Sequence, residues 1–308
     1  MQVRRPEDAK YVLVTVAYNE ELQIDQTIQS VLKQSIRPTL WLVFSDGSTD
    51  RTDQIIKEYS ITFPWIRYLR LEKTGDPGHG VTMASQATVR AMAEARRTLA
   101  AVDYDFIGNL DADITFEHDY YRRIIAEALA DEELGIVGGG ADNVGNDGKI
   151  LPGGFIQSDF VGGPVQFFRK QCMDDIQGYR PYGHADVSAV FMARMKGWKV
   201  RCFPEIRALH HGQPGYTLRE RTPICFRLGR IDHDMGGYLP FILGRCVLQL
   251  FRKPYFVGGV AMLSGFLWAS LQRRKSRLPP DLAIFMRTDQ KQMIRMAFKR
   301  GRRLSRRS

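Results

Sequence analysis

Cysteine is scarce in this sequence of 308 residues, and its pattern points to no metal site or disulfide framework. The four cysteines (Cys172, Cys202, Cys225 and Cys246) lie far apart, with no Cys-x-x-Cys pair and no zinc-ligand spacing. We therefore expect buried, free thiols in a reducing compartment. The N-terminus lacks an apolar run long enough for a signal peptide. We expect the front of the protein to stay in the cytoplasm.

Two glycine-rich nucleotide-binding motifs are also absent. The sequence has no Gly-x-x-x-x-Gly-Lys-Ser/Thr loop, which argues against a P-loop nucleoside triphosphatase. It has no Gly-x-Gly-x-x-Gly at the start of the first expected helix, which argues against a dinucleotide enzyme.

Acidic residues are scarce at the C-terminal end. From Gln272 to Ser308 the sequence has 13 Lys and Arg but only two Asp, so this stretch carries +11 and the other 271 residues carry −1. A basic tail on a near-neutral body suggests an anionic partner, either lipid or nucleic acid, although a solvated tail without function is the alternative. Nucleic acid is disfavoured, because the tail from Arg273 has only two aromatic residues to interleave with its basic ones.

Strand-like and helix-like segments alternate through the first half of the chain. Short apolar, β-branched runs predict strands within residues 11–18, 40–50, 66–71 and 104–113. Amphipathic helices are expected between them, the first of them capped by Asn19. This alternation predicts an α/β domain with a largely parallel sheet. From residue 135 the pattern loosens, although one helix, Asp186–Lys196, is clear, and residues 219–271 are helical and very apolar.

Polar and acidic residues follow three of the expected strands. The three strand ends are Ala17-Tyr18-Asn19-Glu20, Ser45-Asp46-Gly47-Ser48-Thr49-Asp50 and Asp111-Ala112-Asp113. Ligands bind beyond the carboxyl ends of strands in open α/β sheets, so these groups are expected at one site. Carboxylates this close repel one another. A divalent cation removes the repulsion, and Mg²⁺ or Mn²⁺ completes its shell with substrate phosphates and water.

The motifs VTVAYNEE, VFSDGSTD and NLDAD, in this order and at these intervals, resemble those of the family-2 glycosyltransferases over roughly residues 10–215. The resemblance implies a GT-A fold, which is a Rossmann-like, mainly parallel sheet flanked by helices. It also implies an activated nucleotide-sugar donor, a divalent metal (Mg²⁺ or Mn²⁺) and inversion at the anomeric carbon.

The resemblance also assigns roles by position. The donor-binding positions are Ala17, Tyr18, Glu20, Asp46, His79, Asp111 and Ala112. Tyr18, Glu20 and Asp46 would hold the base and ribose, Asp111 would meet the ribose or diphosphate, and Asp113 would bind the metal. Two positions depart from the family pattern. Ser45 stands where the family usually has an acid, and His79 stands near the place of a lysine, so His79 either replaces that lysine or is an exposed loop histidine.

The general base of the family is a carboxylate in a Glu-Asp pair at a helix start. Here Asp186 takes the second position, with Gly197 eleven residues later, and Ala185 replaces the glutamate. Asp186 as a helix cap is the competing interpretation. A base is needed because the acceptor hydroxyl must lose its proton as it attacks the sugar.

A histidine often joins the metal shell after the last strand of this fold, and His210 aligns best with it. His211 is the second choice, and a buried, hydrogen-bonded histidine is the alternative to both. Gly162-Gly163 would form the acceptor-side loop, or a simple turn.

Nineteen residues without charge, PYFVGGVAMLSGFLWASLQ, lie between Lys253 and Arg273. At ~1.5 Å per residue such a helix would only just match a ~30 Å hydrocarbon core. A spanning helix would leave the basic tail outside, against the positive-inside tendency. We expect a re-entrant or interfacial hairpin formed with Tyr238–Phe251, and a helix buried against the catalytic domain is the alternative.

The sequence thus predicts a GT-A catalytic domain at 1–215, an apolar, helical, membrane-associating segment at 216–271 and a basic tail at 272–308. The expected activity is transfer of one sugar to a lipid-linked or membrane-proximal glycan acceptor in bacterial polysaccharide or glycolipid assembly. We expect a peripheral or monotopic protein at the cytoplasmic face of the plasma membrane, bound to an anionic membrane surface and not to nucleic acid.

Two other functions fit the sequence less well. A metal-dependent nucleotidyltransferase would normally need a glycine-rich triphosphate loop with a Lys or Arg after the first strand, where this chain has the acidic AYNEEL. A basic nucleic-acid-binding protein ranks lower still. The sugar, the base and the oligomeric state are left open by the residues.

Overall fold

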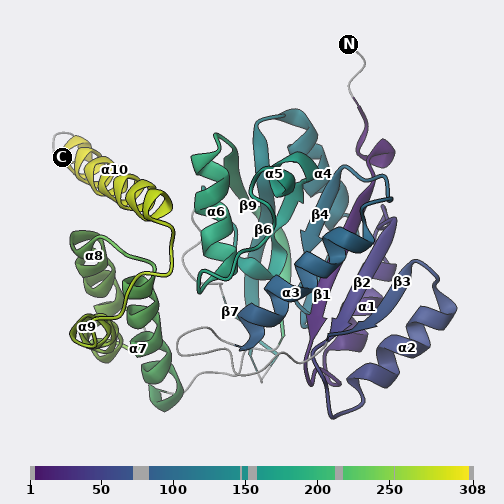
Figure 1. Ribbon diagram of the computed structural model, residues 1–308, viewed down its shortest axis with the longest axis horizontal. Helices are drawn as coiled ribbons and strands as arrows, with labels where there is room; N and C mark the ends of the chain where they lie inside the picture. Colours follow the sequence, from purple (N-terminus) through teal and green to yellow (C-terminus); the bar gives the residue numbers. More distant parts are fainter. Residues whose placement is uncertain are drawn as a thin grey trace. The chain divides into compact units, whose positions relative to one another are not determined.

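The structure is a computed structural model that describes residues 4–71, 83–145, 148–151, 158–211, 218–252 and 254–304. The chain forms two compact units (Figure 1). The first consists of Met1–Pro181 and Ala185–Gly215, and the second of Tyr182–His184 and Tyr216–Ser308.

Parallel strands form one half of the sheet in the first unit. These are β1 (Tyr11–Ala17), β2 (Leu40–Ser45), β3 (Ile66–Arg70) and β4 (Phe106–Asn109), which pair in the order β3-β2-β1-β4. β2 and β4 are buried at every residue, and β1 at all but one. Such continuous burial is typical of parallel strands covered by helices on both faces. The carboxyl ends of β1, β2 and β4 therefore lie at one edge of the sheet.

The other half of the sheet is mixed. It contains β8 (Phe167–Arg169), β6 (Leu134–Val144), β9 (Lys199–His210) and β5 (Ile114–Phe116), in this order beyond β4, with β7 (Ile150–Leu151) paired to β6. β6 and β9 are parallel, whereas β8 runs antiparallel to β4 and β6, and β5 antiparallel to β9. The register of β5 with β9 sets Ile114 opposite His210, directly after the acidic motif.

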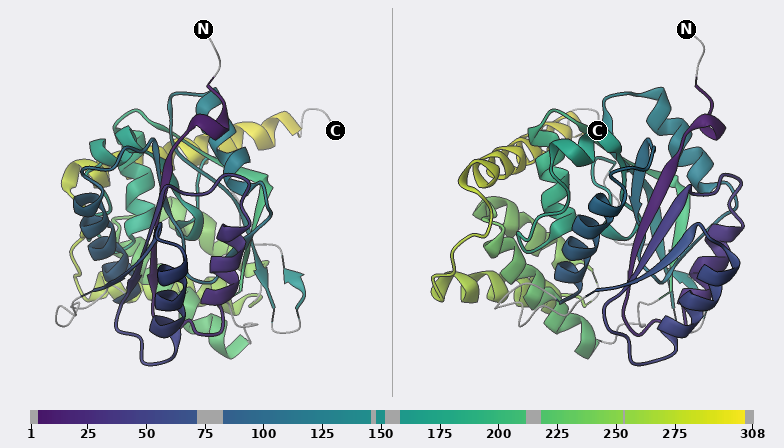
Figure 2. Two further views of the ribbon diagram at one scale, coloured as in Figure 1. Left: turned by 90° about the vertical axis from the view of Figure 1, so that its right-hand side faces the viewer. Right: turned by 45° about the vertical axis from the view of Figure 1, so that its right-hand side comes forward.

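Helices cover both faces of this sheet. They are α1 (Ile24–Leu32), α2 (Thr52–Thr62), α3 (Met83–Thr98), α4 (Tyr120–Ala130), α5 (Lys170–Asp175) and α6 (Ala185–Met195), with short 3₁₀ turns at Pro6–Asp8 and Gly163–Val165. In Figure 2, α1 and α2 lie on one face of the sheet and α3 and α6 on the other. Right-handed crossovers between parallel strands produce this arrangement.

One local expectation is wrong, because Asn19 does not cap the first helix. α1 begins at Ile24, and Asn19 has a positive φ of 55°. Its side-chain oxygen instead accepts a hydrogen bond from the Thr49 N–H at 2.8 Å. The Asn19 carboxamide thus links two loops at the carboxyl edge of the sheet.

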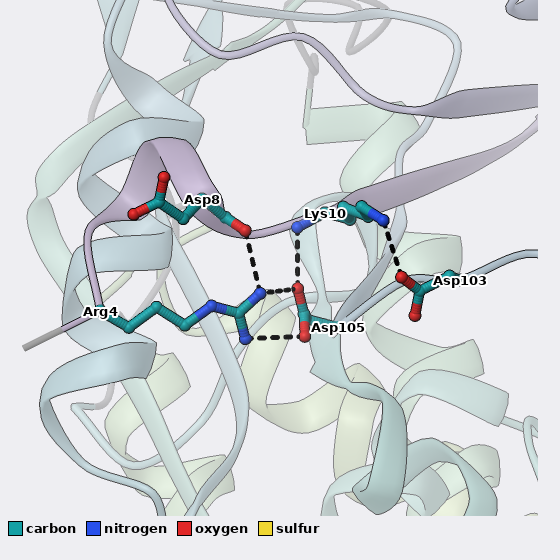
Figure 3. Close-up of polar contacts among 5 residues, drawn as sticks. All are labelled: Arg4, Asp8, Lys10, Asp103 and Asp105. Carbon is teal, nitrogen blue, oxygen red and sulfur yellow. Dashed lines mark hydrogen bonds and ion pairs between the residues drawn. The ribbon is translucent and has the colours of Figure 1, made fainter.

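A charged network fastens the opposite, amino-terminal edge of the sheet (Figure 3). Arg4 donates two hydrogen bonds to the Asp105 carboxylate, at 2.8 and 2.6 Å, and Asp105 also accepts one from the Lys10 N–H at 2.8 Å. The Lys10 ammonium pairs with Asp103 at 2.7 Å. These contacts join the residues just before β1 to those just before β4, and so support the pairing of the two central strands.

The second unit is helical. It contains α7 (Leu218–Asp234), α8 (Leu239–Leu250), α9 (Val257–Leu271) and α10 (Pro280–Leu304), around a core of Ile242, Cys246, Met262 and Phe266. α7 and α9 approach closely through glycines. A Cβ atom on Gly229 would lie 1.8 Å from the Met262 carbonyl oxygen, and one on Gly265 would lie 1.9 Å from that of Phe226.

In the part of the chain that the structure describes, no helix combines the length and the apolarity needed to cross a membrane. α8 and α9 instead follow one another as a packed pair. The expected helical character of residues 219–271 is confirmed. The four cysteines are buried and free, as expected.

Candidate active site

Two loops at the carboxyl edge of the sheet are joined by hydrogen bonds between them. They follow β1 and β2, where Ala17 and Ser45 stand opposite each other in the parallel register. The Glu20 N–H donates to the Thr52 hydroxyl at 2.8 Å, and the Asn19 N–H donates to the Ser48 hydroxyl at 3.2 Å. The backbone of the candidate nucleotide-binding motif is therefore fixed by Ser48 of the second motif and by Thr52, the first residue of α2.

Asp46 forms an ion pair with a residue that lies outside the predicted motifs. Its carboxylate is nearly buried and lies 2.9 Å from the Arg90 guanidinium, which α3 contributes. Tyr18, by contrast, is 54% exposed. Ser45, the departure from the family pattern, is fully buried, and its hydroxyl accepts a hydrogen bond from the Ser48 N–H at 3.4 Å.

Asp113 and His210 form the centre of the site. The His210 Nε2 atom lies 2.9 Å from an Asp113 carboxylate oxygen, and both side chains are nearly buried. The antiparallel pairing of β5 with β9 brings these residues together although 97 positions separate them in the sequence. The adjacent Ala112 is buried, and its carbonyl oxygen accepts a hydrogen bond from the Thr27 hydroxyl at 2.8 Å.

The structure distinguishes the two candidate histidines. The His211 imidazole lies 2.7 Å from the Thr115 hydroxyl, while its backbone N–H donates to the Asp113 carbonyl oxygen. Burial lowers the pKa of His211. Because only the His210 ring bonds the Asp113 carboxylate in the described residues, the geometry favours His210 as the metal ligand.

The acids of the site raise one another's pKa values. Burial and the charge of Asp113 raise the pKa of Asp111 to about 7. Burial, followed by the charges of Asp113 and Asp111, raises the pKa of Glu20 to about 7 as well. Burial lowers the pKa of His210, but its hydrogen bond to Asp113 and the nearby acids outweigh that effect, so its pKa is raised. When its carboxyl groups are ionised, the cluster therefore contains more negative charge than its own positive groups can offset.

This donor set fits a divalent cation. Carboxylate oxygen and imidazole nitrogen are accepted ligands of Mn²⁺, and Mg²⁺ prefers carboxylate oxygen. Within the described ranges, no group of three or more His, Cys, Asp or Glu side chains is arranged to hold a metal ion. A site built on Asp113 and His210 therefore suits a cation whose remaining ligands are substrate phosphates and water.

Asp186, the candidate base, acts on Asp111 through its charge. It is the second residue of α6, and its charge is among those that raise the pKa of Asp111. The loop before β8 lies against it, since a Cβ atom on Gly163 would be 2.9 Å from an Asp186 carboxylate oxygen. The expected acceptor-side glycine and the expected base are therefore neighbours.

Three buried polar residues of this region have no role predicted from the sequence, although Asn109 is the first residue of the NLDAD motif. Asn109, Gln166 and Tyr179 stand within apolar runs or loops, and their hydrogen bonds join segments far apart in the chain. A polar residue inside an otherwise apolar strand, such as Asn109 in FIGN, is the one sequence feature that could have drawn attention to them. His79 lies outside the described residues.

Comparisons with known proteins agree with this geometry. Residues 12–186 match the family model for glycosyl transferase family 2. Over 144 residues the chain is 29% identical to a chondroitin synthase of Pasteurella multocida strain Pm70 and to a hyaluronan synthase of Pasteurella multocida. Each match covers 47% of this chain but 13% of the relative, so the chain spans only a small part of their length.

Two solved structures share the fold. One is the mannosyltransferase PcManGT of Pyrobaculum calidifontis in complex with GDP-Man and Mn²⁺, with a TM-score of 0.59 and 14% identity over 89% of this chain and 91% of that one. The other is GalNAc-T7 with UDP, GalNAc and Mn²⁺, with a TM-score of 0.53 and 14% identity over 87% of this chain and 55% of that one. These likenesses confirm the expected GT-A fold, and the family match shows that the chain belongs to glycosyltransferase family 2.

Proposed function

We propose that this protein transfers one sugar from a nucleotide-sugar donor to a glycan or lipid-linked acceptor, with inversion at the anomeric carbon. The observation that carries the proposal is the Asp113–His210 pair at the carboxyl edge of the sheet, with Asp111 and Glu20 near it and Asp186 close enough for its charge to act on Asp111. The Mn²⁺ and nucleotides in the two solved relatives support the same chemistry here.

Each group has a role in this proposal. Asp113 and His210 would hold Mg²⁺ or Mn²⁺, and the bound cation would supply positive charge to the donor diphosphate as the leaving group. Tyr18, Glu20 and Asp46 hold the base and ribose, with Arg90 fixing the Asp46 carboxylate. Ala17 and Ala112 contribute backbone positions at the strand ends.

The transfer itself needs one proton acceptor. Asp186 takes the proton of the acceptor hydroxyl as its oxygen forms a bond to the anomeric carbon. The bond from that carbon to the phosphate oxygen breaks, and its electron pair leaves with the nucleoside diphosphate. Attack from the side opposite the leaving group inverts the anomeric carbon.

Nucleotide binding tests the metal assignment. We expect UDP, GDP or dTDP to raise the melting temperature of the protein when Mn²⁺ is present, and to raise it far less in EDTA, because ligands that bind only the folded state stabilise it. Asp113→Ala should abolish the Mn²⁺-dependent shift. The control is Asp103→Ala, which removes an acid from the opposite edge of the sheet and should keep the shift. A full shift in EDTA would exclude the metal site.

The second unit supports a membrane-proximal acceptor. The sequence has no Asp or Glu from Met235 to Pro280 but has seven Lys and Arg there. Large apolar side chains of α8, α9 and their connection are exposed, namely Leu239, Leu243, Val247, Leu248, Phe251, Tyr255, Phe256, Val257, Val260, Leu267, Trp268 and Leu271. We call these twelve residues the apolar surface of the second unit.

A surface that is both apolar and bordered by basic residues matches an anionic lipid surface in both respects. We propose that the protein is peripheral or monotopic at the cytoplasmic face of the plasma membrane, where it meets a lipid-linked acceptor. Its relatives by sequence are synthases of chondroitin and hyaluronan, which supports a role in polysaccharide assembly.

A further inference from the structure

Gln166 is a fully buried amide whose hydrogen bonds meet three different segments. Its Nε2 atom donates to the Val161 carbonyl oxygen at 2.9 Å and to the Asp186 carbonyl oxygen at 3.1 Å. Its Oε1 atom accepts a hydrogen bond from the Tyr179 hydroxyl at 2.6 Å. One side chain thus ties the acceptor-side loop to the first turn of α6, which carries the candidate base.

Tyr179 fixes the orientation of that amide. It is almost fully buried, and its ring packs edge-on against Phe168 with centroids 5.7 Å apart. Burial raises the pKa of Tyr179 well above its ordinary value, so its hydroxyl keeps its proton and donates it. Because a hydroxyl that donates to Oε1 leaves Nε2 pointing the other way, Tyr179 directs both N–H groups of Gln166 to the two carbonyl oxygens.

The acceptor-side loop is also tied to the acidic motif. Asn109 donates from Nδ2 to the Gly163 carbonyl oxygen at 2.7 Å and, more weakly, to an Asp111 carboxylate oxygen at 3.5 Å. Its backbone N–H donates to the Gln166 carbonyl oxygen at 2.8 Å. The loop is therefore held between β4 on one side and α6 on the other, with Gly163 against the Asp186 carboxylate.

We propose that Gln166, oriented by Tyr179, is a positioning residue that holds Asp186 in its place for deprotonating the acceptor. This inference rests on the proposed role of Asp186 as the base. Gln166 touches no substrate in it. The physical reason for the effect is that proton transfer requires hydrogen-bond distance to the acceptor hydroxyl, and a shift of about 1 Å lowers rates by as much as ~100-fold.

The test compares turnover with donor binding. Gln166→Met keeps the size of the side chain but removes its hydrogen bonds, and Tyr179→Phe removes only the hydroxyl. We expect kcat to fall at least ~10-fold in Gln166→Met, and less in Tyr179→Phe, with the KM for the donor within about twofold of wild type. The probes are UDP-N-acetylglucosamine, UDP-N-acetylgalactosamine and GDP-mannose with Mn²⁺, and the readout is release of the nucleoside diphosphate, with water as the acceptor.

Two matched controls separate positioning from general loss of stability. Gln34 is a buried glutamine with the same kind of hydrogen bonds, to the carbonyl oxygens of Ser30 and Glu117 and from the Tyr121 N–H. Tyr11 is a buried tyrosine that donates to the Ile36 carbonyl oxygen. Gln34→Met and Tyr11→Phe should lower the melting temperature by comparable amounts without changing kcat.

Hydrogen exchange supplies a readout that needs no turnover. In Gln166→Met we expect faster amide exchange in the acceptor-side loop and the first turn of α6, and unchanged exchange in β1 and β2. The proposal is overturned if these two segments exchange as in wild type, if Gln34→Met lowers kcat equally, or if donor binding is lost together with turnover. Asp186→Asn distinguishes a failure of the proposed base from a failure of the proposed positioning role. If it is active, the proposed base is wrong, whereas an inactive Asp186→Asn beside a fully active Gln166→Met refutes the positioning role alone.

Discussion

At the scale of single residues, the acids of the site are placed against their own electrostatic preference. Asp111 is flanked by the charges of Asp113 and Asp186, and Glu20 by those of Asp113, Asp111 and Asp50. An arrangement that raises pKa values to about 7 costs folding free energy whenever the groups are ionised. Such a cost is expected where a bound cation removes it.

Asp111→Asn should therefore stabilise the protein when no metal is present. At pH 8, above the raised pKa of about 7, the wild-type carboxyl is ionised beside Asp113, whereas an amide of the same shape has no charge. The amide also keeps an oxygen for the Asn109 hydrogen bond. We expect a gain of about 1 kcal/mol, a rise of roughly 2–4 °C in melting temperature measured in EDTA. With Mn²⁺ and nucleotide present, the wild type should be more stable than Asp111→Asn. A variant that is less stable than wild type in EDTA would show that Asp111 is paired in a way that favours its charge.

Gly163 sets how closely the acceptor-side loop approaches the base. A methyl group there would meet an Asp186 carboxylate oxygen at 2.9 Å, while the same group on the neighbouring Gly162 would meet nothing nearer than Pro164 at 3.8 Å. Gly163→Ala should lower kcat at least ~10-fold and leave nucleotide binding intact, because it displaces the base and not the donor site. Gly162→Ala is the matched control and should keep its activity. Equal activity of the two variants, measured as nucleoside diphosphate release, would argue against Asp186 as the base.

At the scale of elements, the parallel half of the sheet and most helices could be predicted from the sequence. Long buried strands such as β1 and amphipathic helices such as α4 carry their periodicity in contiguous residues. β5 and β8 could not be predicted, since strands of three residues are too short to show a period. Their antiparallel pairing depends on partners far along the chain.

The candidate site also contains some residues that the sequence could predict and others that it could not. Motifs at the strand ends predicted which residues belong to it, and the β5–β9 register then favoured His210 over His211. Gln166 and Tyr179 could not be predicted, because a buried amide or hydroxyl is recognised only by the distant oxygens that it bonds. Asn109 opens the NLDAD motif, but its hydrogen bond to the Gly163 carbonyl oxygen could not be read from the sequence.

The α7–α9 packing gives a prediction at this scale. A methyl group on Gly265 would lie 1.9 Å from the Phe226 carbonyl oxygen, and backbone at that distance cannot yield without separating the helices. Gly265→Ala should destabilise the second unit by at least ~2 kcal/mol. Gly244→Ala on α8 meets no atom within 4 Å and should be neutral or stabilise the helix by ~0.5–1 kcal/mol. Chemical denaturation followed by circular dichroism checks both, and equal stability of the two variants would mean that α7 and α9 are not in contact.

At the scale of the whole molecule, the two units differ in the kind of surface they present. The first buries most of its apolar residues around the sheet and carries the acids of the candidate site at the carboxyl edge. The second leaves the apolar surface of α8 and α9 exposed and is rich in Lys and Arg. α9 is apolar on every side: Phe266 faces the core and packs against His233, whereas Leu267 and Trp268 are about half exposed. A helix of this kind is expected to have a second apolar neighbour.

Flotation with liposomes tests whether that neighbour is lipid. Leu267→Ser with Trp268→Ser removes exposed apolar area and leaves the Phe266 core contact in place, so binding should weaken at low and high salt alike, since the hydrophobic term does not depend on screening. Deletion of 299–308 removes six Lys and Arg but retains Gln290, which accepts a hydrogen bond from the Tyr238 N–H.

The deletion should weaken binding to anionic liposomes by up to ~1 kcal/mol for each charge removed, and this loss should shrink as salt screens the charges. The control is Ile61→Ser, which removes an even more exposed apolar residue from α2 in the first unit and should float like wild type. If the full-length protein ignores both anionic and neutral liposomes, the apolar surface packs against protein. In that case the acceptor need not be a lipid.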